Sequence, residues 1–277
     1  MWRGDMIIRY ASDIHLELGM NSQYMQAVGL AEGGDVLLLA GDVAYLENRR
    51  LERDPFFDWC SYNFSQTIIV PGNHEYYRDP RSRGNMPGCP DLAGTLEGYE
   101  HFVRPNVRYL NNRSLRLGDV EVFATTLWTK PSPVDYAALS NGMNDFHQIR
   151  YKGHRLLPGD LSAIHAYCRA WLDGALGGSD APHKIILTHH CPTMRREFDA
   201  YAPSGALYGA FHVDMEGFIS EHDADIWIYG HTHFNGGAGL RLPSMKEDGT
   251  VLLCNQLGYI EADEQLGGFR RDAGVEV

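Results

Sequence analysis

The sequence predicts an α/β protein organised around a parallel β-sheet with right-handed crossover connections. Strand-like and helix-like segments alternate over the first part of the chain in the order β-α-β-α-β, which is the pattern of such a sheet. Polar residues end three of these strands: Asp13, Asp42 and Asn73 are 29 and 31 residues apart, close to the roughly 30 residues of one β-α-β unit. We therefore expect the three to meet at one sheet edge, where ligands bind in open α/β folds.

The first predicted strands are short apolar runs, as expected for strands buried on both faces. Pro71-Gly72 ends the third strand abruptly, and Gly33-Gly34 is expected to close the first helix. The elements predicted in this part are strands at 6–11, 35–40 and 67–70 and helices around 24–30 and 56–64.

Residues 76–105 interrupt this alternation. The segment has four prolines, several glycines and little periodicity, which is typical of a binding loop or lid. It also carries a basic cluster in an acidic protein: Arg78, Arg81, Arg83 and Arg104. These arginines either contact a substrate phosphate or are solvated on the loop surface.

The second half of the chain continues the α/β pattern around another irregular stretch, residues 125–149. Asp160 is expected to cap a long helix whose apolar face includes Tyr167 and which stops at Gly177-Gly178. The other elements predicted here are strands at 107–110, 114–117, 120–123, 184–188, 225–229 and 251–255, a short helix at 214–221, and a polar tail. We predict one domain, residues 1–277, with substrate-side insertions at about 76–105 and 128–160.

Composition and charge narrow the possible functions. Hydrophobic residues make up 44% of the 277 residues, enough for a substantial core. The net charge of −12 repels polyanions, so long nucleic acid and anionic membranes are not expected partners. Five scattered cysteines without Cys-x-x-Cys spacing argue against a disulfide framework or a zinc ribbon. With no signal-like or membrane-spanning apolar stretch, we expect a cytoplasmic protein.

Five predicted strands end in side chains that can bind metal ions. Carboxylate, amide and imidazole ligands without thiolates suit Mn, Fe, Zn or Ni. The set is too large for one tetrahedral ion and fits two ions that share a carboxylate, as in two-metal sites with ions about 3.5–4 Å apart. The metal-competent residues at the strand ends are Asp13, His15, Asp42, Asn73, His74, His189, His190, His231 and His233.

The series of motifs resembles the calcineurin-like metallophosphoesterase superfamily. The motifs are Asp13-x-His15, Gly41-Asp42, Gly72-Asn73-His74-Glu75, Thr188-His189 and Gly230-His231-Thr232-His233. They occur in the order of the family and span residues 13–233. The resemblance implies a four-layer α-β-β-α sandwich, with two mixed sheets flanked by helices and an irregular cap or loop insertion.

The resemblance also implies a role for each motif residue. Asp13, His15 and His233 would hold the first metal ion. Asn73, His189 and His231 would hold the second, and Asp42 would bridge both. His74 would be the catalytic histidine that faces the phosphate without binding metal, and Glu75 would orient it.

The fourth motif leaves its ligand open between two adjacent histidines. Aligning the strand ends favours His189, whereas counting back from Pro192 favours His190; we take His189. Three other places near the motifs could contribute to the site or be structural. They are Asn144-Asp145-Phe146, which resembles a segment of one bacterial branch of the family, the pair Arg195 and Arg196, and residues 255–259.

The function implied is a metal-dependent phosphoesterase that hydrolyses phosphomonoester or phosphodiester bonds by attack of a metal-bridging hydroxide. Two divalent or mixed-valence ions would be its cofactors, and a small phosphate ester its substrate. The alternative is a catalytically silent metal-binding scaffold of the same fold. A metallo-β-lactamase-like enzyme would need a His-x-His-x-Asp-His cluster, which the sequence lacks. Nothing in the sequence indicates an oligomeric state.

Overall fold

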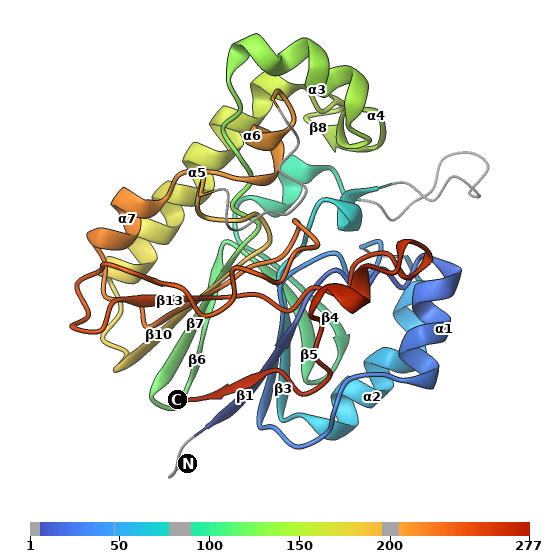
Figure 1. Ribbon diagram of the computed structural model, residues 1–277, viewed down its shortest axis with the longest axis vertical. Helices are drawn as coiled ribbons and strands as arrows, with labels where there is room; N and C mark the ends of the chain where they lie inside the picture. The colour runs from blue at the N-terminus through green and yellow to red at the C-terminus, as the bar shows by residue number, and fades with distance from the viewer. Residues whose placement is uncertain (1–5, 47, 78–89, 196–204) are drawn as a thin grey trace.

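Two six-stranded mixed β-sheets pack face to face in the computed structural model, and helices cover the outer side of each sheet (Figure 1). The structure describes residues 6–46, 48–77, 90–195 and 205–277. The layers run α-β-β-α, which confirms the four-layer sandwich.

The first sheet contains the three strands predicted nearest the N-terminus. Its strands are β1 Ile7–Ala11, β2 Val36–Leu39, β3 Gln66–Ile69, β4 Tyr99–Arg104, β5 Val107–Asn111 and β14 Gly274–Glu276. They are ordered β14-β1-β2-β3-β5-β4. The four central strands are parallel, and β14 and β4 run antiparallel at the two edges.

The second sheet has the same plan. Its strands are β6 Arg113–Leu117, β7 Val120–Thr125, β10 His183–Thr188, β11 Ile226–Ile228, β12 Arg241–Leu242 and β13 Thr250–Leu253. They are ordered β12-β13-β11-β10-β7-β6, again with four parallel strands in the centre and an antiparallel strand at each edge. Each sheet therefore presents a row of parallel carboxyl ends.

The helices form two outer layers and a group beyond the strand ends. They are α1 Gly19–Ala27, α2 Pro55–Asn63, α3 Tyr136–Gly142, α4 Asp145–Gln148, α5 Pro158–Gly177, α6 Tyr208–Phe211 and α7 Glu216–Ser220. Short elements are η1 Leu51–Arg53, η2 His74–Tyr76, η3 Leu92–Thr95, η4 Pro133–Asp135, η6 Ile260–Ala262, η7 Glu264–Gly267 and the pair β8 Arg150–Tyr151 and β9 His154–Arg155. Helices α1 and α2 lie on one side, α5 and α7 on the other, and α3, α4 and α6 gather at one end (Figure 1).

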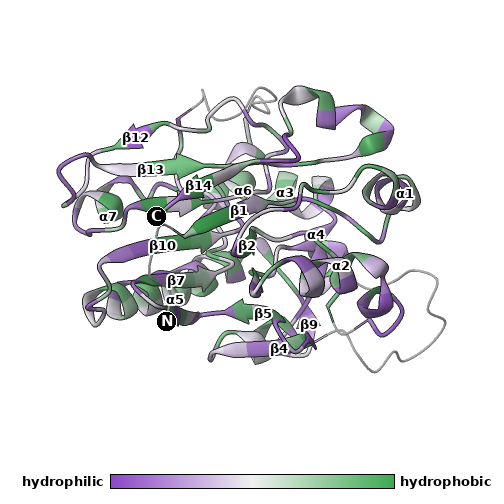
Figure 2. Ribbon diagram, turned by 90° about the horizontal axis from the view of Figure 1, so that it is seen from below, coloured by the Kyte–Doolittle hydropathy of each residue, from purple (hydrophilic) through white to green (hydrophobic). Residues whose placement is uncertain are grey.

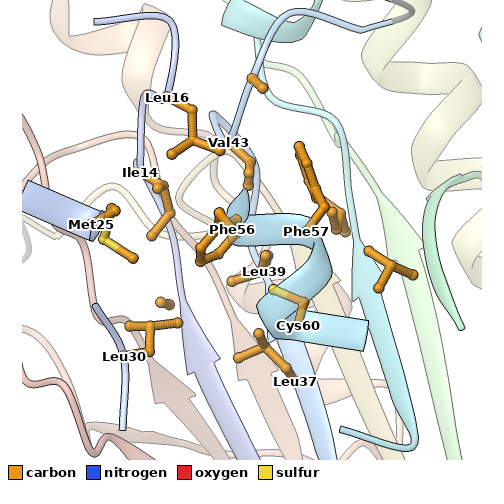
Figure 3. Close-up of a cluster of buried hydrophobic side chains, with 14 of the residues drawn as sticks. Ile14, Leu16, Met25, Leu30, Leu37, Leu39, Val43, Phe56, Phe57 and Cys60 are labelled. Carbon is orange, nitrogen blue, oxygen red and sulfur yellow. The ribbon is translucent and has the colours of Figure 1, made fainter. Parts of the chain in front are cut away.

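The alternation of side chains along each strand divides the interior into separate cores. In β2, Val36 and Leu38 face the opposite sheet, whereas Leu37 and Leu39 face the outer helices, because successive side chains point to opposite faces. Figure 3 shows Leu39 near Phe56 and Leu37 near Cys60, both residues of α2, within one buried cluster. Burying each such side chain contributes roughly 1.5–3 kcal/mol. The apolar strands accordingly lie at the centre of the molecule (Figure 2).

Several elements differ from the sequence prediction. Helix α1 begins at Gly19 and ends at Ala27, before the predicted closure at Gly33-Gly34. Helix α5 begins at Pro158, and the Asp160 carboxylate accepts a hydrogen bond from the Leu157 N–H at 2.9 Å, so Asp160 acts from the first turn and is not the cap. Tyr167 is 46% exposed and does not belong to the buried face.

Two segments predicted as irregular contain regular structure. Strand β4 lies in the 76–105 insertion, of which residues 78–89 are outside the described part, and it pairs antiparallel with β5. The polar tail supplies β14, which pairs with β1 and places Val275 opposite Ile8. Both strands were missed because their residues are exposed or partly buried and they lack the apolar run of a central strand. No helix among the described residues is long and apolar enough to cross a membrane.

Candidate metal centre

The residues predicted to bind metal meet where the central strands of both sheets end. Asp13 and His15 follow β1, Asp42 follows β2, and Asn73 and His74 follow β3. From the second sheet, His189 follows β10, and His231 and His233 follow β11. All but His74 and His233 are buried, and these two are partly buried. Parallel connections thus bring together residues more than 200 positions apart.

Five of these residues have a left-handed backbone, which is uncommon outside glycine. Each such conformation costs of order 1–3 kcal/mol and persists only where the surroundings impose it. Its concentration at the strand ends indicates that the turns are shaped to aim these side chains inward. The φ angles are 55° at Asp13, 52° at His15, 53° at Asp42, 75° at His231 and 52° at His233.

The first cluster consists of Asp13, His15 and His233. The Nε2 atoms of His15 and His233 are 3.3 Å apart, and His233 Nε2 is 3.3 Å from Asp13 Oδ1. The Nδ1–H groups of both histidines donate to carboxylates, His15 to Glu17 at 3.0 Å and His233 to Glu264 at 2.6 Å. Their Nε2 atoms therefore converge with a carboxylate oxygen. Against the effect of burial, the carboxylates of Asp13 and Glu264 raise the pKa of His233 to about 9.

The second cluster consists of Asp42, His189 and His231, with Asn73 beside them. His189 Nδ1 donates to the Ala40 carbonyl at 2.8 Å, which leaves its Nε2 lone pair facing Asn73 Oδ1 at 3.0 Å. His231 Nδ1 is 3.1 Å from the same Nε2 atom. Asn73 Oδ1 and the His189 Nε2 lone pair are therefore two hydrogen-bond acceptors that face each other.

Asp42 lies between the two clusters and presents one oxygen to each. Its Oδ2 is 3.9 Å from His15 Nε2, and its Oδ1 is 3.5 Å from His189 Nε2. The His74 backbone N–H donates to Oδ1 at 2.9 Å and holds the carboxylate in place. Ligand atoms of each cluster lie within 4.8 Å of one another.

The electrostatics of the clusters favour a bound cation. Burial lowers the pKa of His15 and of His189 to about 4, so both imidazoles are neutral at pH 7, as metal binding requires. Burial, with the nearby carboxylates of Glu75 and Asp13, raises the pKa of Asp42 well above its usual range. A cation bound between the neutral rings of His15 and His189 and the Asp42 carboxylate would stabilise the ionised form of that carboxylate.

The carboxylate that orients His74 is Glu17, and not Glu75 as predicted. Glu17 Oε1 accepts from His74 Nδ1 at 2.9 Å and from His15 Nδ1 at 3.0 Å. Glu75 instead accepts backbone N–H groups of Asp42 at 2.9 Å and of Gly72 at 2.8 Å, besides those of residues 43 and 44. Glu75 therefore joins the two loops that carry Asp42 and Asn73.

The adjacent histidines of the fourth motif differ in position. His189 belongs to the second cluster, whereas His190 Nδ1 lies 3.1 Å from the Thr126 carbonyl. The ring of His190 packs 4.4 Å from that of His231 and borders the cluster.

Sequence reasoning missed two carboxylates around the clusters, Glu17 and Glu264, which pair with His15 and His233. Asp145 lies in a segment that the sequence singled out, and it accepts from Asn73 Nδ2 at 2.9 Å. Glu17 follows the first motif by two residues, the only signal that could have identified it. Residues 255–259 contribute to the site, since the ring of Tyr259 packs 4.6 Å from that of His233.

A cavity of about 320 Å³ opens onto both clusters. Its walls include Met143 and Asp145 of the 128–160 insertion, Phe211 of α6 and Tyr259. His74 also lines it, with its side chain 15% exposed. The insertion predicted on the substrate side thus forms part of the cavity wall.

Of the basic residues singled out in the sequence, the structure describes Arg104 and Arg195, and neither lines the cavity. Arg104 donates to Asp58 of α2 at 2.6 Å, away from the clusters, and Arg195 pairs with Glu216 at 2.7 Å. The other arginines that could contact phosphate or be solvated lie outside the described residues: Arg78, Arg81, Arg83 and Arg196.

Fold and site together define an α/β sandwich protein with a candidate metal centre at its strand ends. The chain belongs to the calcineurin-like phosphoesterase family, because the model of that family matches residues 6–235. Membership of this metal-dependent family supports the interpretation that the protein is a hydrolase.

Two comparisons extend this finding. The chain is 27% identical over 271 residues to the uncharacterized protein L509 of Acanthamoeba polyphaga mimivirus, with 91% of each chain covered. The crystal structure of phosphopantetheinyl hydrolase from Mycobacterium tuberculosis is similar with a TM-score of 0.69 and 15% identity, covering 99% of this chain and 96% of that one. At that identity the likeness shows a shared fold.

Proposed function

We propose that the protein is a dinuclear metal-dependent phosphoesterase that hydrolyses small phosphate mono- or diesters. The observation that carries this proposal is the position of Asp42. Its Oδ2 faces His15 at 3.9 Å and its Oδ1 faces His189 at 3.5 Å. A carboxylate with one oxygen toward each of two ligand clusters is suited to bridge two cations.

The two clusters divide the proposed ligands between the ions. The first ion would be held by Asp13, His15 and His233, and the second by Asn73, His189 and His231, with Asp42 shared. The oxygen and nitrogen ligands suit Mn, Fe, Zn or Ni. Bound there, such ions would supply Lewis acidity, lower the pKa of water toward neutrality and offset the charge of phosphate oxygens.

His74 is the proposed proton donor to the leaving oxygen. Glu17 accepts its Nδ1–H at 2.9 Å, which leaves Nε2 for the substrate side of the ring. The ring stacks on Tyr77, with centroids 4.3 Å apart, and lines the cavity. A histidine held in this way can transfer a proton from Nε2 to a departing alkoxide, a step that general acids accelerate by about 10²–10⁴-fold.

The cavity and the charge support a small substrate. A volume of about 320 Å³ is at the lower end of the range of roughly 300–1,000 Å³ for ligand pockets. The net charge of −12 disfavours a long polyanion that would have to approach the whole surface.

The proposal is tested by metal-dependent hydrolysis. The protein is stripped of metal, reconstituted with Mn, Fe, Zn or Ni, and assayed on one aryl phosphomonoester and one aryl phosphodiester. We expect turnover with at least one metal, and loss of bound metal together with turnover in Asp42→Asn.

The variant His74→Ala separates chemistry from metal binding. It should keep its metal and lose about 10²–10⁴-fold in rate on a substrate with a poor leaving group. Full activity of this variant would contradict the proton-donor role. Metal binding without hydrolysis in the wild-type protein would favour the scaffold alternative, and failure to bind any metal would refute both.

A further inference from the structure

Asp145 reaches the candidate metal centre from the 128–160 insertion. It is the first residue of α4 and is buried. Asn73, in contrast, follows β3 of the first sheet, 72 residues earlier. A side chain from an insertion thus contacts a proposed ligand of the second ion.

Asn73, Tyr77 and Asp145 form a closed triangle of hydrogen bonds. The Asn73 Nδ2 group donates to Asp145 Oδ1 at 2.9 Å and to the Tyr77 hydroxyl at 3.2 Å. The Tyr77 hydroxyl in turn donates to Asp145 Oδ1. Because these two acceptors are hydrogen-bonded to each other, they lie on the same side of Nδ2 and share one of its protons.

This triangle determines which way the Asn73 amide points. Asp145 Oδ1 accepts hydrogen bonds from both the Asn73 amide nitrogen and the Tyr77 hydroxyl, so it selects the NH₂ end of the amide and turns the amide Oδ1 away. Oδ1 consequently faces the second cluster, 3.0 Å from His189 Nε2. The opposite orientation would place two donors in the cluster and the amide oxygen against a carboxylate.

The same triangle touches the proposed proton donor. The Tyr77 ring stacks on that of His74, with centroids 4.3 Å apart and an interplanar angle of 26°. Asp145 thereby restrains the ring on which His74 rests, as well as the ligand amide.

We propose that Asp145 is a positioning residue that fixes the amide of Asn73 for the second metal ion and, through Tyr77, supports His74. This inference rests on the proposed function, because it assigns Asn73 as a ligand of that ion. Outer partners of metal ligands commonly change metal affinity or activity by about 10–100-fold when they are replaced.

The decisive variant is Asp145→Leu, which keeps the size of the side chain but removes its acceptor oxygens. Calorimetric titration of the metal-free full-length protein with Mn²⁺ should show one of two binding events weakened by about 10–100-fold. Asp145→Asn retains an acceptor oxygen and should lose less. Asp135→Leu is the matched control, since Asp135 lies in the same insertion and lines a different cavity; it should bind Mn²⁺ as the wild type does.

A double-mutant cycle distinguishes positioning from a general structural role. If Asp145 acts through Asn73, adding Asp145→Leu to Asn73→Ala should cause no further loss of Mn²⁺ affinity, whereas independent contributions would add. Tyr77→Phe keeps the ring on His74 but lacks the hydroxyl, and it should weaken the same binding event. This variant replaces Asp145→Leu in the test if Asp145→Leu does not fold. Wild-type Mn²⁺ binding in Asp145→Leu, or additive losses in the cycle, would overturn the inference. Failure of the wild type to bind any of Mn, Fe, Zn or Ni would instead overturn the proposed function.

Discussion

Replacing Gly72 with alanine tests whether the strand-end turns are shaped by the metal ligands. A β-carbon at this position would lie 2.7 Å from the Asp42 backbone nitrogen and 2.7 Å from His189 Cε1, and closer still to Asp42 Oδ1. Contacts under 3.0 Å essentially never occur for real β-carbons. The backbone nitrogen cannot rotate away, so the carboxylate that lies between the clusters must be displaced.

The expected size of the effect follows from this crowding. Overpacking of a filled interior costs about 1–3 kcal/mol of unfolding free energy. A functional constellation tolerates displacements of about 0.5 Å, and misplacement by about 1 Å can reduce turnover by about 10²-fold. We therefore expect Gly72→Ala to lose more in Mn²⁺ affinity and turnover than its modest destabilisation would explain.

The assay combines urea unfolding at 25 °C, Mn²⁺ titration and hydrolysis of an aryl phosphate. Gly174→Ala is the matched control, because Gly174 lies inside α5 and its β-carbon would meet nothing within 4 Å. The control should gain about 0.5–1 kcal/mol from improved helix propensity and retain wild-type turnover. Wild-type stability, Mn²⁺ affinity and turnover in Gly72→Ala would refute the reasoning.

Two further predictions concern carboxylates with different partners. Glu17→Gln should lower turnover by about 10–100-fold because the charge that orients both His15 and His74 is lost. Steady-state rates are compared with those of Glu264→Gln, whose carboxylate contacts one motif histidine, His233, and the Tyr259 N–H; equal rates in the two variants would contradict the role of Glu17. Burial alone would raise the pKa of Asp91, but backbone N–H bonds, including that of Gly153 at 2.7 Å, hold it below the ordinary value of 3.8. A carboxylate whose pKa is lowered in the folded state contributes stability at pH above its unfolded pKa and loses that contribution as pH falls. Asp91→Asn should therefore be less stable than the wild type at pH 7, and the urea midpoints of the two proteins should converge as pH falls below 3.8. A difference in midpoint that persists unchanged in acid would contradict this.

The sequence determined the central strands and the ligand side chains that follow them. Runs such as residues 36–40 are apolar at every position, as expected for a strand buried on both faces. The polar residues after them, such as Asp42, follow directly on such strands at the spacing of one β-α-β unit. Because parallel strands must end at one edge, their convergence could be predicted without knowing any contact.

The edge strands β4 and β14 are parts of the fold that local patterns did not indicate. Strand β14 has exposed residues at both ends, and its pairing with β1 joins opposite ends of the chain. Such a strand is defined by hydrogen bonds to a distant neighbour and leaves no apolar run in the sequence.

The partners of the ligands were likewise decided only by tertiary structure. Glu75 follows His74 directly, yet the turn places its carboxylate beneath the Asp42 loop, and Glu17 of another strand end takes its predicted place beside His74. Asp145 contacts Asn73 across 72 residues. The side chains of adjacent residues often point in different directions. Hydrogen-bond partners therefore depend on which residues the fold brings together in space and not on proximity in the chain.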